Sequence, residues 1–343
     1  MTDGKEKLGV GVIGLGVGEQ HALAYADHDA CELRWLFDLS TEQAAAVRGR
    51  VGHGDIADSY EAILADAGTG IVSIATFDHL HADAVKAAFN AGKHVFVEKP
   101  LCRTMGELHI IIDAWNNAAE GGGRPHLASN LVLRDAPLYG WLKGVIGDGT
   151  LGEIYAFDGD YLYGRLEKIT DGWRGDVPDY SVMEGGGIHL IDLMIDVLGQ
   201  KPATAATVAN KIATQGSNFR YDDFMATTFT FPSGLIGRIT ANFGCMHRHH
   251  HIVRVFGTKA TFIYDDQGPR LITSRDENST AEPLDLAPLP SGKGVLIPAF
   301  VDGIVNGVDP APAAFKEFDL IAAIAAADQS LAAQTTITIE YPT

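Results

Sequence analysis

The sequence predicts an α/β protein in two parts. An N-terminal domain built on a doubly wound parallel sheet precedes an α+β domain with a large open, mostly antiparallel sheet. Over residues 8–129, short apolar runs alternate with amphipathic helical segments, a pattern typical of a parallel sheet covered on both faces. A glycine-rich turn follows the first of these runs. After about residue 150, strand-like runs follow one another through short turns, which indicates an open antiparallel sheet.

The first domain is expected to span residues 1–129 and the second residues 130–343, because 343 residues are too many for one comfortable core. The apolar runs that predict the strands of the first domain are 8–14, 31–37, 71–76, 94–97 and 126–129. Its helical patterns lie at about 19–28, 41–48, 59–66, 80–91 and 104–119. In the second domain, strands are predicted at 153–164, 207–212, 223–231, 235–243, 251–257 and 260–265, and helices at 188–198 and about 313–332.

The composition excludes several classes of partner. A formal net charge of -18 argues against nucleic acid and against an anionic membrane surface, because both need clustered Lys and Arg. Cys31, Cys102 and Cys245 lie far apart, without metal-type spacing or a disulfide framework, which suits a reducing compartment. The sequence has neither a signal-peptide pattern nor an apolar stretch of the roughly 20 residues that a membrane span needs, so we expect a cytoplasmic protein.

The glycine-rich turn indicates a dinucleotide site. In "GVIGLGVGEQHALAY" (residues 11–25), Gly14, Gly16 and Gly18 stand between a predicted strand and a predicted helix, where a diphosphate can approach the backbone. The match is imperfect, because Glu19 stands where a third glycine is usual. Asp38 ends the second strand, where an acid would bind the adenosine ribose and repel a 2′-phosphate. No Arg follows directly, so NAD is favoured over NADP.

Three segments resemble the glucose–fructose oxidoreductase/inositol dehydrogenase (Gfo/Idh/MocA) family. They are "GLGVGEQHALAY" (14–25), "IVSIATFDHLHADAVKAAFNAGKHVFVEKPLCRT" (71–104) and "GGGIHLIDLM" (185–194), which span both predicted domains in the order of the family. The resemblance implies an N-terminal NAD(P)-binding Rossmann domain and a C-terminal α/β domain. The open sheet of the second domain usually forms the oligomer interface in this family, which implies a homodimer or homotetramer.

The resemblance also implies a role for the Glu-Lys-Pro stretch, residues 98–100. Lys99 would lie beside the nicotinamide and the substrate hydroxyl, where a cation stabilises alkoxide character as hydride leaves. Pro100 would hold the preceding peptide bond in a fixed geometry, with a cis bond as one option. The residues expected around the cofactor are Gly14, Gly16, Val17, Gly18, Asp38, Ala75, Thr76, His79, Glu98 and Lys99. Phe77 and Asp78 replace the Pro-Asn that is common in the family, so the local contacts are expected to differ.

The predicted helix at 188–198 carries a histidine in its first turn. In the family this histidine is the usual acid/base, which carries over to His189. A helix N-terminus disfavours imidazolium, so His189 should start neutral and accept a proton. Many relatives place an aspartate four residues earlier, whereas this chain has Gly185 there, next to Glu184. Asp192 is therefore the candidate for orienting the imidazole or binding a substrate hydroxyl; the alternative is a solvated helix face.

Aromatic and basic residues concentrate in residues 161–180 of this acidic chain. Aromatic faces stack on sugar rings and Arg binds carboxylate or phosphate, so the segment favours a sugar-like substrate. An exposed loop with ordinary charges is the alternative. The residues expected to contact the substrate are Asn130, Arg134, Tyr163, Arg165, Trp173, Arg174 and Asp192. Asn130 and Arg134 have a second interpretation as part of a domain-linker turn.

Four histidines in "CMHRHHHIVRVFG" (residues 245–257) suggest a metal site at first sight. His249 and His251 would lie on one face of a strand and His250 on the other, with His247 just before them. No Asp, Glu or Cys completes a ligand set at metal spacing, so we expect no metal. A polar sheet face or a subunit contact is the favoured interpretation.

These features predict an NAD(P)-dependent dehydrogenase that oxidises a secondary hydroxyl of a sugar, sugar acid, cyclitol or nucleotide sugar, with Lys99 and His189 as the catalytic pair. Two alternatives stay open. One is a redox-neutral NAD-dependent lyase or glycosidase that returns the hydride within each cycle. The other is a non-enzymatic regulator that responds to NAD or sugar on the same fold.

Overall fold

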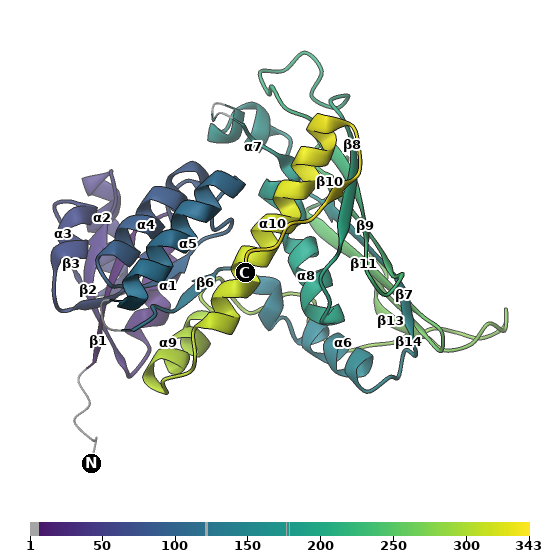
Figure 1. Ribbon diagram of the computed structural model, residues 1–343, viewed down its shortest axis with the longest axis horizontal. Coiled ribbons are helices and arrows are strands. Elements are labelled where there is room, and N and C mark those ends of the chain that lie inside the picture. The colour runs from purple at the N-terminus through teal and green to yellow at the C-terminus, as the bar shows by residue number, and fades with distance from the viewer. Residues whose placement is uncertain (1–6, 121–122, 176, 178) are drawn as a thin grey trace. The chain divides into compact units, whose positions relative to one another are not determined.

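The computed structural model describes residues 7–120, 123–175, 177 and 179–343. The chain forms two compact units (Figure 1). Unit 1 runs to Val132 and includes Ser291–Ile321, and unit 2 comprises Leu133–Pro290 and Ala322–Thr343. The predicted division into residues 1–129 and 130–343 did not include the return of residues 291–321 to the first unit.

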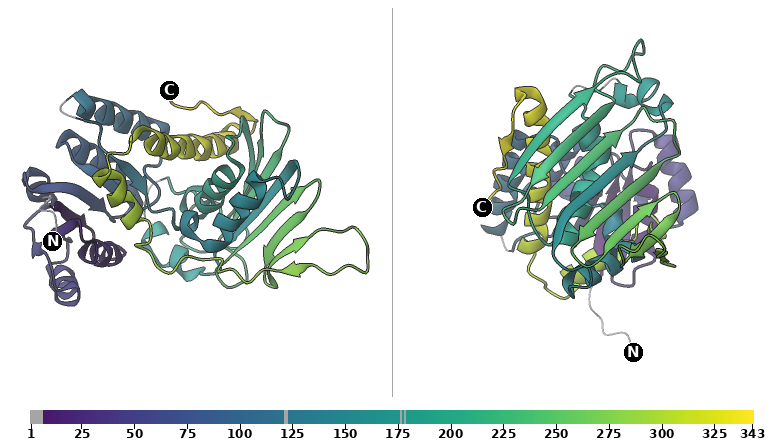
Figure 2. Two further views of the ribbon diagram at one scale, coloured as in Figure 1. Left: turned by 90° about the horizontal axis from the view of Figure 1, so that it is seen from below. Right: turned by 90° about the vertical axis from the view of Figure 1, so that its right-hand side faces the viewer.

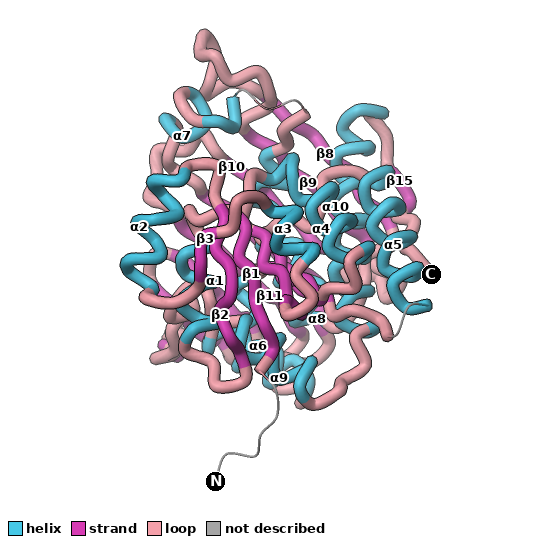
Figure 3. Tube along the Cα trace, turned by 90° about the vertical axis from the view of Figure 1, so that its left-hand side faces the viewer, coloured by secondary structure: helices cyan, strands magenta, loops and turns pink. Residues whose placement is uncertain are grey.

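Unit 1 contains a six-stranded parallel sheet in the order β3-β2-β1-β4-β5-β6, with helices against it (Figure 3). Its strands are β1 (Leu8–Ile13), β2 (Cys31–Phe37), β3 (Asp55–Ile56), β4 (Thr69–Ile74), β5 (His94–Val97) and β6 (Leu127–Ser129). Its helices are α1 (Gly18–Ala26), α2 (Thr41–Val51), α3 (Tyr60–Ala65), the 3-10 turn η1 (Asp78–Leu80), α4 (His81–Asn90), α5 (Met105–Glu120), α9 (Ile297–Val305) and the first part of α10 (Ala311–Ala333). This is the predicted doubly wound sheet.

Two hydrophobic clusters explain why the strands of unit 1 are apolar on both sides. In one, Trp115 of α5 packs against Phe318 of α10, with ring centroids 5.7 Å apart. In the other, Phe96 of β5 packs against Phe300 of α9 at 5.5 Å. The apolar faces of α9 and early α10 therefore belong to the core of unit 1, which is why residues 291–321 return to it.

Unit 2 contains a nine-stranded mixed sheet in the order β14-β13-β12-β11-β7-β10-β9-β8-β15. Of its pairs, β7 and β10 run parallel and the others are antiparallel. The strands are β7 (Ile154–Leu162), β8 (Thr204–Asn210), β9 (Phe224–Thr230), β10 (Ile236–Asn242), β11 (His250–Gly257), β12 (Thr261–Asp265), β13 (Gly268–Ile272), β14 (Glu282–Pro283) and β15 (Ile337–Thr338). The prediction of a large, mostly antiparallel sheet is confirmed.

One face of this sheet packs against helices and the other does not. The remaining helical elements are η2 (Val132–Asp135), α6 (Pro137–Gly147), α7 (Glu167–Thr170), η3 (Trp173–Gly175), the π-helical turn η4 (Met183–Gly187) and α8 (Ile188–Leu198). The right-hand view of Figure 2 looks onto the sheet from the side away from α6 and α8. Burial alternates along the strands, as in β11, which is the pattern of a sheet buried on one side.

Candidate active site

The glycine-rich turn lies at the carboxyl end of β1, the edge at which doubly wound sheets bind ligands. Gly14 has a φ of 82° and its backbone runs so close to the Ala75 carbonyl that a side chain would collide with it. No protein atom lies within 4 Å of a Cβ placed on Gly16, so the space beside the turn is open. Val17 precedes α1 without a side-chain capping hydrogen bond, which leaves the first backbone N–H groups of α1 to a ligand.

Asp38 and Glu19 complete the surroundings of the turn. The Asp38 carboxylate accepts hydrogen bonds from the backbone N–H of Leu15 at 2.7 Å and of Ser40 at 2.9 Å. A carboxylate has about four acceptor positions, so two stay available for ribose hydroxyls. Glu19, which replaces the third glycine, turns to the side and pairs with Arg50 at 2.6 Å. The replacement of the third glycine by Glu19 therefore does not block the glycine-rich turn.

Buried polar atoms without a protein partner test whether a nicotinamide nucleotide fits unit 1. Thr76 Oγ1, Ser129 Oγ and Asn130 Oδ1 are buried and have no hydrogen-bond partner among the described residues. They follow or end β4 and β6, at the same edge of the sheet as the glycine turn. Buried polar atoms are normally satisfied, so these three positions fit a ligand rich in donors and acceptors, such as the carboxamide and ribose of NAD.

Lys99 directly follows Glu98, whose carboxylate is held inside unit 1. Glu98 Oε1 accepts a hydrogen bond from Asn130 Nδ2 at 2.6 Å and lies 3.3 Å from His21 Nε2. The other nitrogen of His21 lies 2.9 Å from the Ser73 hydroxyl. Burial raises the pKa of Glu98. The contacts with His21 and Asn130 and the charge of Lys99 lower it by more than burial raises it, so the resulting pKa is about 2. Glu98 is therefore an ionised, buried anchor for the backbone that carries Lys99.

A second histidine, His81, holds the other side of this backbone. Its Nδ1 lies 2.6 Å from the carbonyl oxygen of Pro100, and its Nε2 lies 3.2 Å from that of Thr76. The bond between Lys99 and Pro100 is cis, one of the geometries expected from the sequence. The fully buried ring of His81 thus joins the segment that follows β4 to the segment that carries Lys99.

Three predicted contacts in unit 1 have protein partners in the structure. Asn130 is 2% exposed, and its amide also donates to the carbonyl oxygen of Lys293 at 2.9 Å, so the side chain supports Glu98. The substrate contact expected of Asn130 and the cofactor contact expected of Glu98 stay predictions. His79 lies in η1 and stacks on Phe77, with ring centroids 6.1 Å apart.

In unit 2, His189 occupies the first turn of α8, directly after the π-helical turn η4. Its ring stacks on Tyr161 of β7, with centroids 5.9 Å apart and an interplanar angle of 16°. A side chain at Gly186 would collide with Tyr161, and one at Gly185 would collide with the Tyr180 hydroxyl. Tyr180 therefore fills the space in which many relatives are expected to place a carboxylate, and Glu184 beside it is buried.

Asp192 and Arg134, both predicted to contact substrate, form an ion pair with each other. Arg134 Nη2 lies 2.6 Å from Asp192 Oδ1, and Arg134 Nε lies 3.0 Å from Oδ2. One turn further along α8, Asp196 pairs with Lys143 of α6 at 2.8 Å. The carboxylates on this face of α8 are therefore paired with cations, and Asp192 is buried, unlike in the alternative of a solvated face. The substrate contacts expected of Arg134 and Asp192 stay predictions.

The predicted aromatic and basic residues group into contacting pairs. Tyr163 stacks on Tyr161 with centroids 6.2 Å apart. The guanidinium of Arg165 lies 5.7 Å from the ring centre of Tyr163, and that of Arg174 lies 4.5 Å from Trp173. Aromatic faces and cations of this kind suit a polyhydroxylated ring, although the stacked phenols are buried, with Tyr161 4% and Tyr163 7% exposed.

The histidines of residues 247–251 separate into two groups. His249 and His251 both contact Tyr161, with ring centroids 5.3 Å away in each case. His250 packs instead against Tyr264, and His247 pairs with Asp266 at 3.0 Å. His249 and His251 thus lie on the strand face that carries Tyr161, and the expected polar sheet face or subunit contact stays a prediction. Within the described part of the chain, no group of His, Cys, Asp or Glu is arranged to hold a metal ion.

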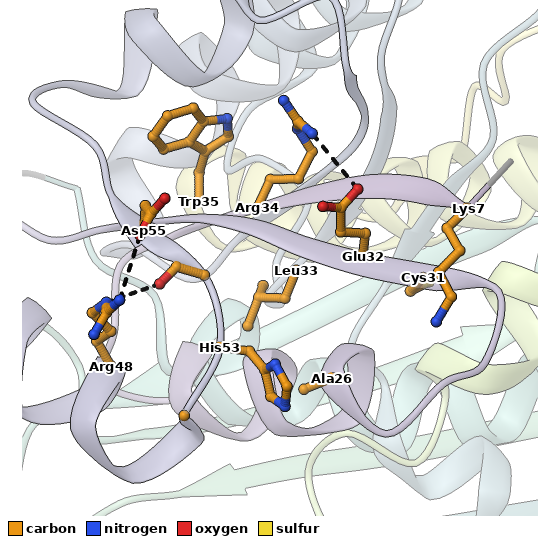
Figure 4. Close-up of a pocket in the computed structure, with 12 residues that line it drawn as sticks. Lys7, Ala26, Cys31, Glu32, Leu33, Arg34, Trp35, Arg48, His53 and Asp55 are labelled. Atoms are coloured by element: carbon orange, nitrogen blue, oxygen red, sulfur yellow. Dashed lines mark hydrogen bonds and ion pairs between the residues drawn. The ribbon is translucent and has the colours of Figure 1, made fainter.

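A pocket of about 630 Å³ lies away from these residues (Figure 4). Lys7 precedes β1 and Cys31 begins β2, so the pocket extends to the amino ends of these strands, opposite the glycine turn. Two of its basic groups are engaged by acids: Arg34 pairs with Asp66 at 2.8 Å and Arg48 with Asp55 at 3.5 Å.

From the sequence, no role in the site was assigned to three residues: His21, His81 and His251. His21 and His81 lie inside the quoted motifs, and their spacing on helices could have shown that each faces the sheet. His251 was considered, but its neighbours come from strands and a helix that are remote in sequence.

No helix in the described ranges is long and apolar enough to cross a membrane.

Comparisons with known proteins agree with this arrangement. A family model described as "Oxidoreductase family, NAD-binding Rossmann fold" matches residues 8–120, and one described as "GFO/IDH/MocA C-terminal domain" matches residues 139–263. Levoglucosan dehydrogenase of Pseudarthrobacter phenanthrenivorans is 26% identical over 293 residues, covering 76% of this chain and 74% of that protein. A 1,5-anhydro-D-fructose reductase of Ensifer adhaerens is 30% identical over 212 residues, 59% of each chain.

More distant relatives share the fold or part of the sequence. A solved structure of levoglucosan dehydrogenase in complex with NADH and L-sorbose superposes with a TM-score of 0.84 at 22% identity, covering 98% of this chain and 99% of the other. A 2,7-anhydro-N-acetylneuraminate hydratase of Escherichia coli is 23% identical over 271 residues, 76% of this chain and 68% of its own. Together, the two family matches and the NAD-binding sheet show that this chain is an oxidoreductase of the GFO/IDH/MocA family.

Proposed function

We propose that this oxidoreductase is an NAD-dependent dehydrogenase that oxidises a secondary hydroxyl of a sugar, sugar acid, cyclitol or nucleotide sugar. The observation that carries the proposal is the anchoring of the backbone on both sides of Lys99. It follows β5 at the ligand-binding edge of the sheet, on a backbone anchored by Glu98 on one side and His81 on the other. An ordinary surface lysine would not need a backbone that is held by two buried histidines, His21 and His81.

The cofactor would be held at the carboxyl edge of the unit 1 sheet. Gly14, Gly16 and the N–H groups that open α1 would bind the diphosphate, and Asp38 the adenosine ribose. The unpaired Thr76 hydroxyl would face the nicotinamide nucleotide. When bound, NAD supplies the hydride acceptor, and this chain supplies binding, orientation and charge.

Two side chains would then act on the substrate hydroxyl. The Lys99 ammonium would stabilise the negative charge that develops on the oxygen, and His189 would accept the hydroxyl proton. Tyr163, Arg165, Trp173 and Arg174 would bind the rest of the ring. Asp192 and Arg134 would act as a pair that fixes α8 beneath His189. The proposal requires both catalytic groups to reach one hydroxyl in the complex with NAD and substrate.

Replacing Lys99 by Met tests the proposal, because Met keeps the length of the side chain and removes its charge. We expect turnover to fall by about 10²–10³-fold or more, since one charge-stabilising donor contributes on that order. NADH binding, followed by fluorescence, should stay close to that of the wild type. The matched control is Lys86→Met on the exposed side of α4, which should leave turnover unchanged. Undiminished turnover in the Lys99 variant would show that the assignment is wrong.

The same assay separates the alternative reactions. A relative of this chain is named as a hydratase, so a redox-neutral cycle is a specific competitor. A net dehydrogenase accumulates NADH in proportion to product, which absorbance at the nicotinamide band reports directly. Product without NADH would favour the redox-neutral cycle, and no hydride exchange with any sugar would favour a regulator.

A further inference from the structure

His251 lies beside the ring of His189 in unit 2. In the antiparallel register of β11 and β7 it stands opposite Tyr161, with ring centroids 5.3 Å apart. The centroids of His251 and His189 are 6.2 Å apart, and those of His251 and His249 are 5.2 Å apart. The fold thus brings a strand imidazole next to the residue proposed to accept the substrate proton.

The ring of His251 is buried and uncharged. It is 7% exposed, and burial together with the neighbouring His249 and His250 lowers its pKa to about 3. A neutral imidazole carries one N–H and one lone pair, so each nitrogen needs a partner of its own. Nε2 of His251 is buried, yet it has no hydrogen-bond partner in the described part of the chain. Such atoms are rare in native proteins and point to a water or a ligand.

The neighbours of His251 limit what that ligand can be. Its ring contacts are Tyr161, His249 and His189, none of which is a carboxylate, and the described residues form no metal-binding group. The uncharged ring offers no charge with which to hold an anion. A hydroxyl group, which both donates and accepts, suits either nitrogen of a neutral imidazole.

We propose that Nε2 of His251 binds a hydroxyl of the substrate next to the one that His189 deprotonates, so that this part of the site takes an uncharged polyol. The inference rests on the proposed function and adds the residue that recognises the substrate. His251 then fixes the orientation of the sugar ring by binding one hydroxyl, while His189 and Lys99 act on the adjacent hydroxyl. This part of the site selects for a second hydroxyl and not for a phosphate or carboxylate.

The test compares His251→Phe, which keeps a ring and removes the nitrogens, with His250→Phe. His250 is the adjacent residue, and its Nε2 also lacks a described partner, but its ring packs against Tyr264 and not beside His189. Each protein is saturated with NADH and titrated by calorimetry with levoglucosan, myo-inositol and methyl β-D-glucopyranoside. The compound that binds is then replaced by its monodeoxy analogues. Thermal melts of all variants check that unit 2 is folded, and His251→Gln, which restores an N–H, provides a second variant.

We expect His251→Phe to weaken binding of the parent compound by about three- to tenfold, the value of one hydrogen bond, while His250→Phe changes it less than twofold. One deoxy analogue should bind the wild type correspondingly weakly and bind the Phe variant no worse than the parent does. His251→Gln should recover part of the loss.

Two results would overturn the proposal in distinguishable ways. In the first, every deoxy analogue loses the same factor in affinity, relative to the parent compound, with the wild type and with His251→Phe. His251 then does not bind the substrate hydroxyl, although the dehydrogenase proposal stands. A wild-type protein that binds NADH and none of the three compounds contradicts the uncharged polyol inferred for this part of the site, and the role of His251 falls with it, whereas a dehydrogenase of sugar acids or nucleotide sugars stands.

Discussion

Glu98 is the residue whose environment departs furthest from what a strand end suggests. An acid beside a lysine at the edge of a sheet is usually solvated, but this carboxylate lies among His21, Asn130 and the backbone of β5. Its charge is retained because hydrogen bonds to the charged form outweigh the cost of burial. The sequence predicted a role for Lys99, but it did not predict that the neighbouring Glu98 would be held in its charged form by His21 and Asn130.

The low pKa of Glu98 makes a prediction about stability. Its folded pKa of about 2 lies below the ordinary value of 4.5, so the folded state gains stability from the ionised form at any pH above about 4.5. That gain is lost as the pH falls from about 4.5 to about 2. We expect Glu98→Gln to lower the free energy of unfolding by about 2 kcal/mol at pH 6, with the difference from the wild type shrinking towards pH 3. Urea unfolding across this range measures it.

The matched control for Glu98 is Glu120→Gln at the exposed end of α5. Because that side chain is solvated, its replacement should change the free energy of unfolding by less than about 0.5 kcal/mol at every pH. A Glu98 variant whose deficit is the same at pH 6 and pH 3 would contradict the linkage argument, since the loss would then come from packing and not from the charge.

At the scale of elements, α8 is fixed by ion pairs of unequal burial. The side chain of Asp192 is 6% exposed and that of its partner Arg134 is 20% exposed, whereas Lys143, the partner of Asp196, is 50% exposed. Removing one member of a buried pair leaves an uncompensated charge, and an exposed pair contributes little. The two pairs on one helix face should therefore respond very differently to the same substitution.

We expect Asp192→Asn to lower the free energy of unfolding by about 3 kcal/mol and Asp196→Asn by less than about 1 kcal/mol. The double variant Arg134→Met with Asp192→Leu should lose less than Asp192→Asn alone, because neither charge is left unpaired. Chemical denaturation of the wild type and the three variants gives these differences, and adding the single variants Arg134→Met and Asp192→Leu completes the cycle that gives the coupling energy. If Asp192→Asn keeps its stability and instead raises KM alone, Asp192 contacts substrate directly, as the sequence first suggested.

The elements that the sequence predicts well have strong local signals. Residues 188–198 were expected to be helical from their apolar spacing, and α8 has those bounds; β5 likewise matches its predicted run. α6 was missed because Gly140 and Gly144 interrupt its pattern, and packing against α8 outweighs that weak propensity. The pairing of Asp192 with Arg134 joins residues 58 apart in sequence, which periodicity cannot show.

At the scale of the whole chain, the predictable part of the site consists of motif residues and the unpredictable part consists of their neighbours. Gly14, Asp38, Lys99 and His189 could be proposed from short segments. The support from His21 and His81 and the contact of His251 with His189 depend on packing between segments remote in sequence. The return of residues 291–321 to unit 1 has the same cause: α9 was not predicted, and the apolar residues of early α10 do not show which sheet they cover.

The uncovered face of the unit 2 sheet is where the sequence analysis expects the interface of a homodimer or homotetramer. Ile236 on the interior strand β10 is 47% exposed, and Val208 on β8, next to the edge strand β15, is 69% exposed. Beside them, Arg238 pairs with Asp158 at 2.7 Å, which limits the charge that this face presents. A wide sheet face with apolar side chains and internally neutralised charges suits contact with a second copy of itself.

We expect the wild type to sediment as a dimer or tetramer and Ile236→Lys to shift it to a smaller species at the same concentration, because a buried lysine without a partner opposes assembly. Ile110→Lys is the matched control: Ile110 lies on α5 of unit 1 and is equally exposed, at 47%. It should leave the sedimentation coefficient unchanged. Analytical ultracentrifugation over a concentration series separates the species. A monomeric wild type, or an equal effect of the two substitutions, would show that the sheet face is not the interface.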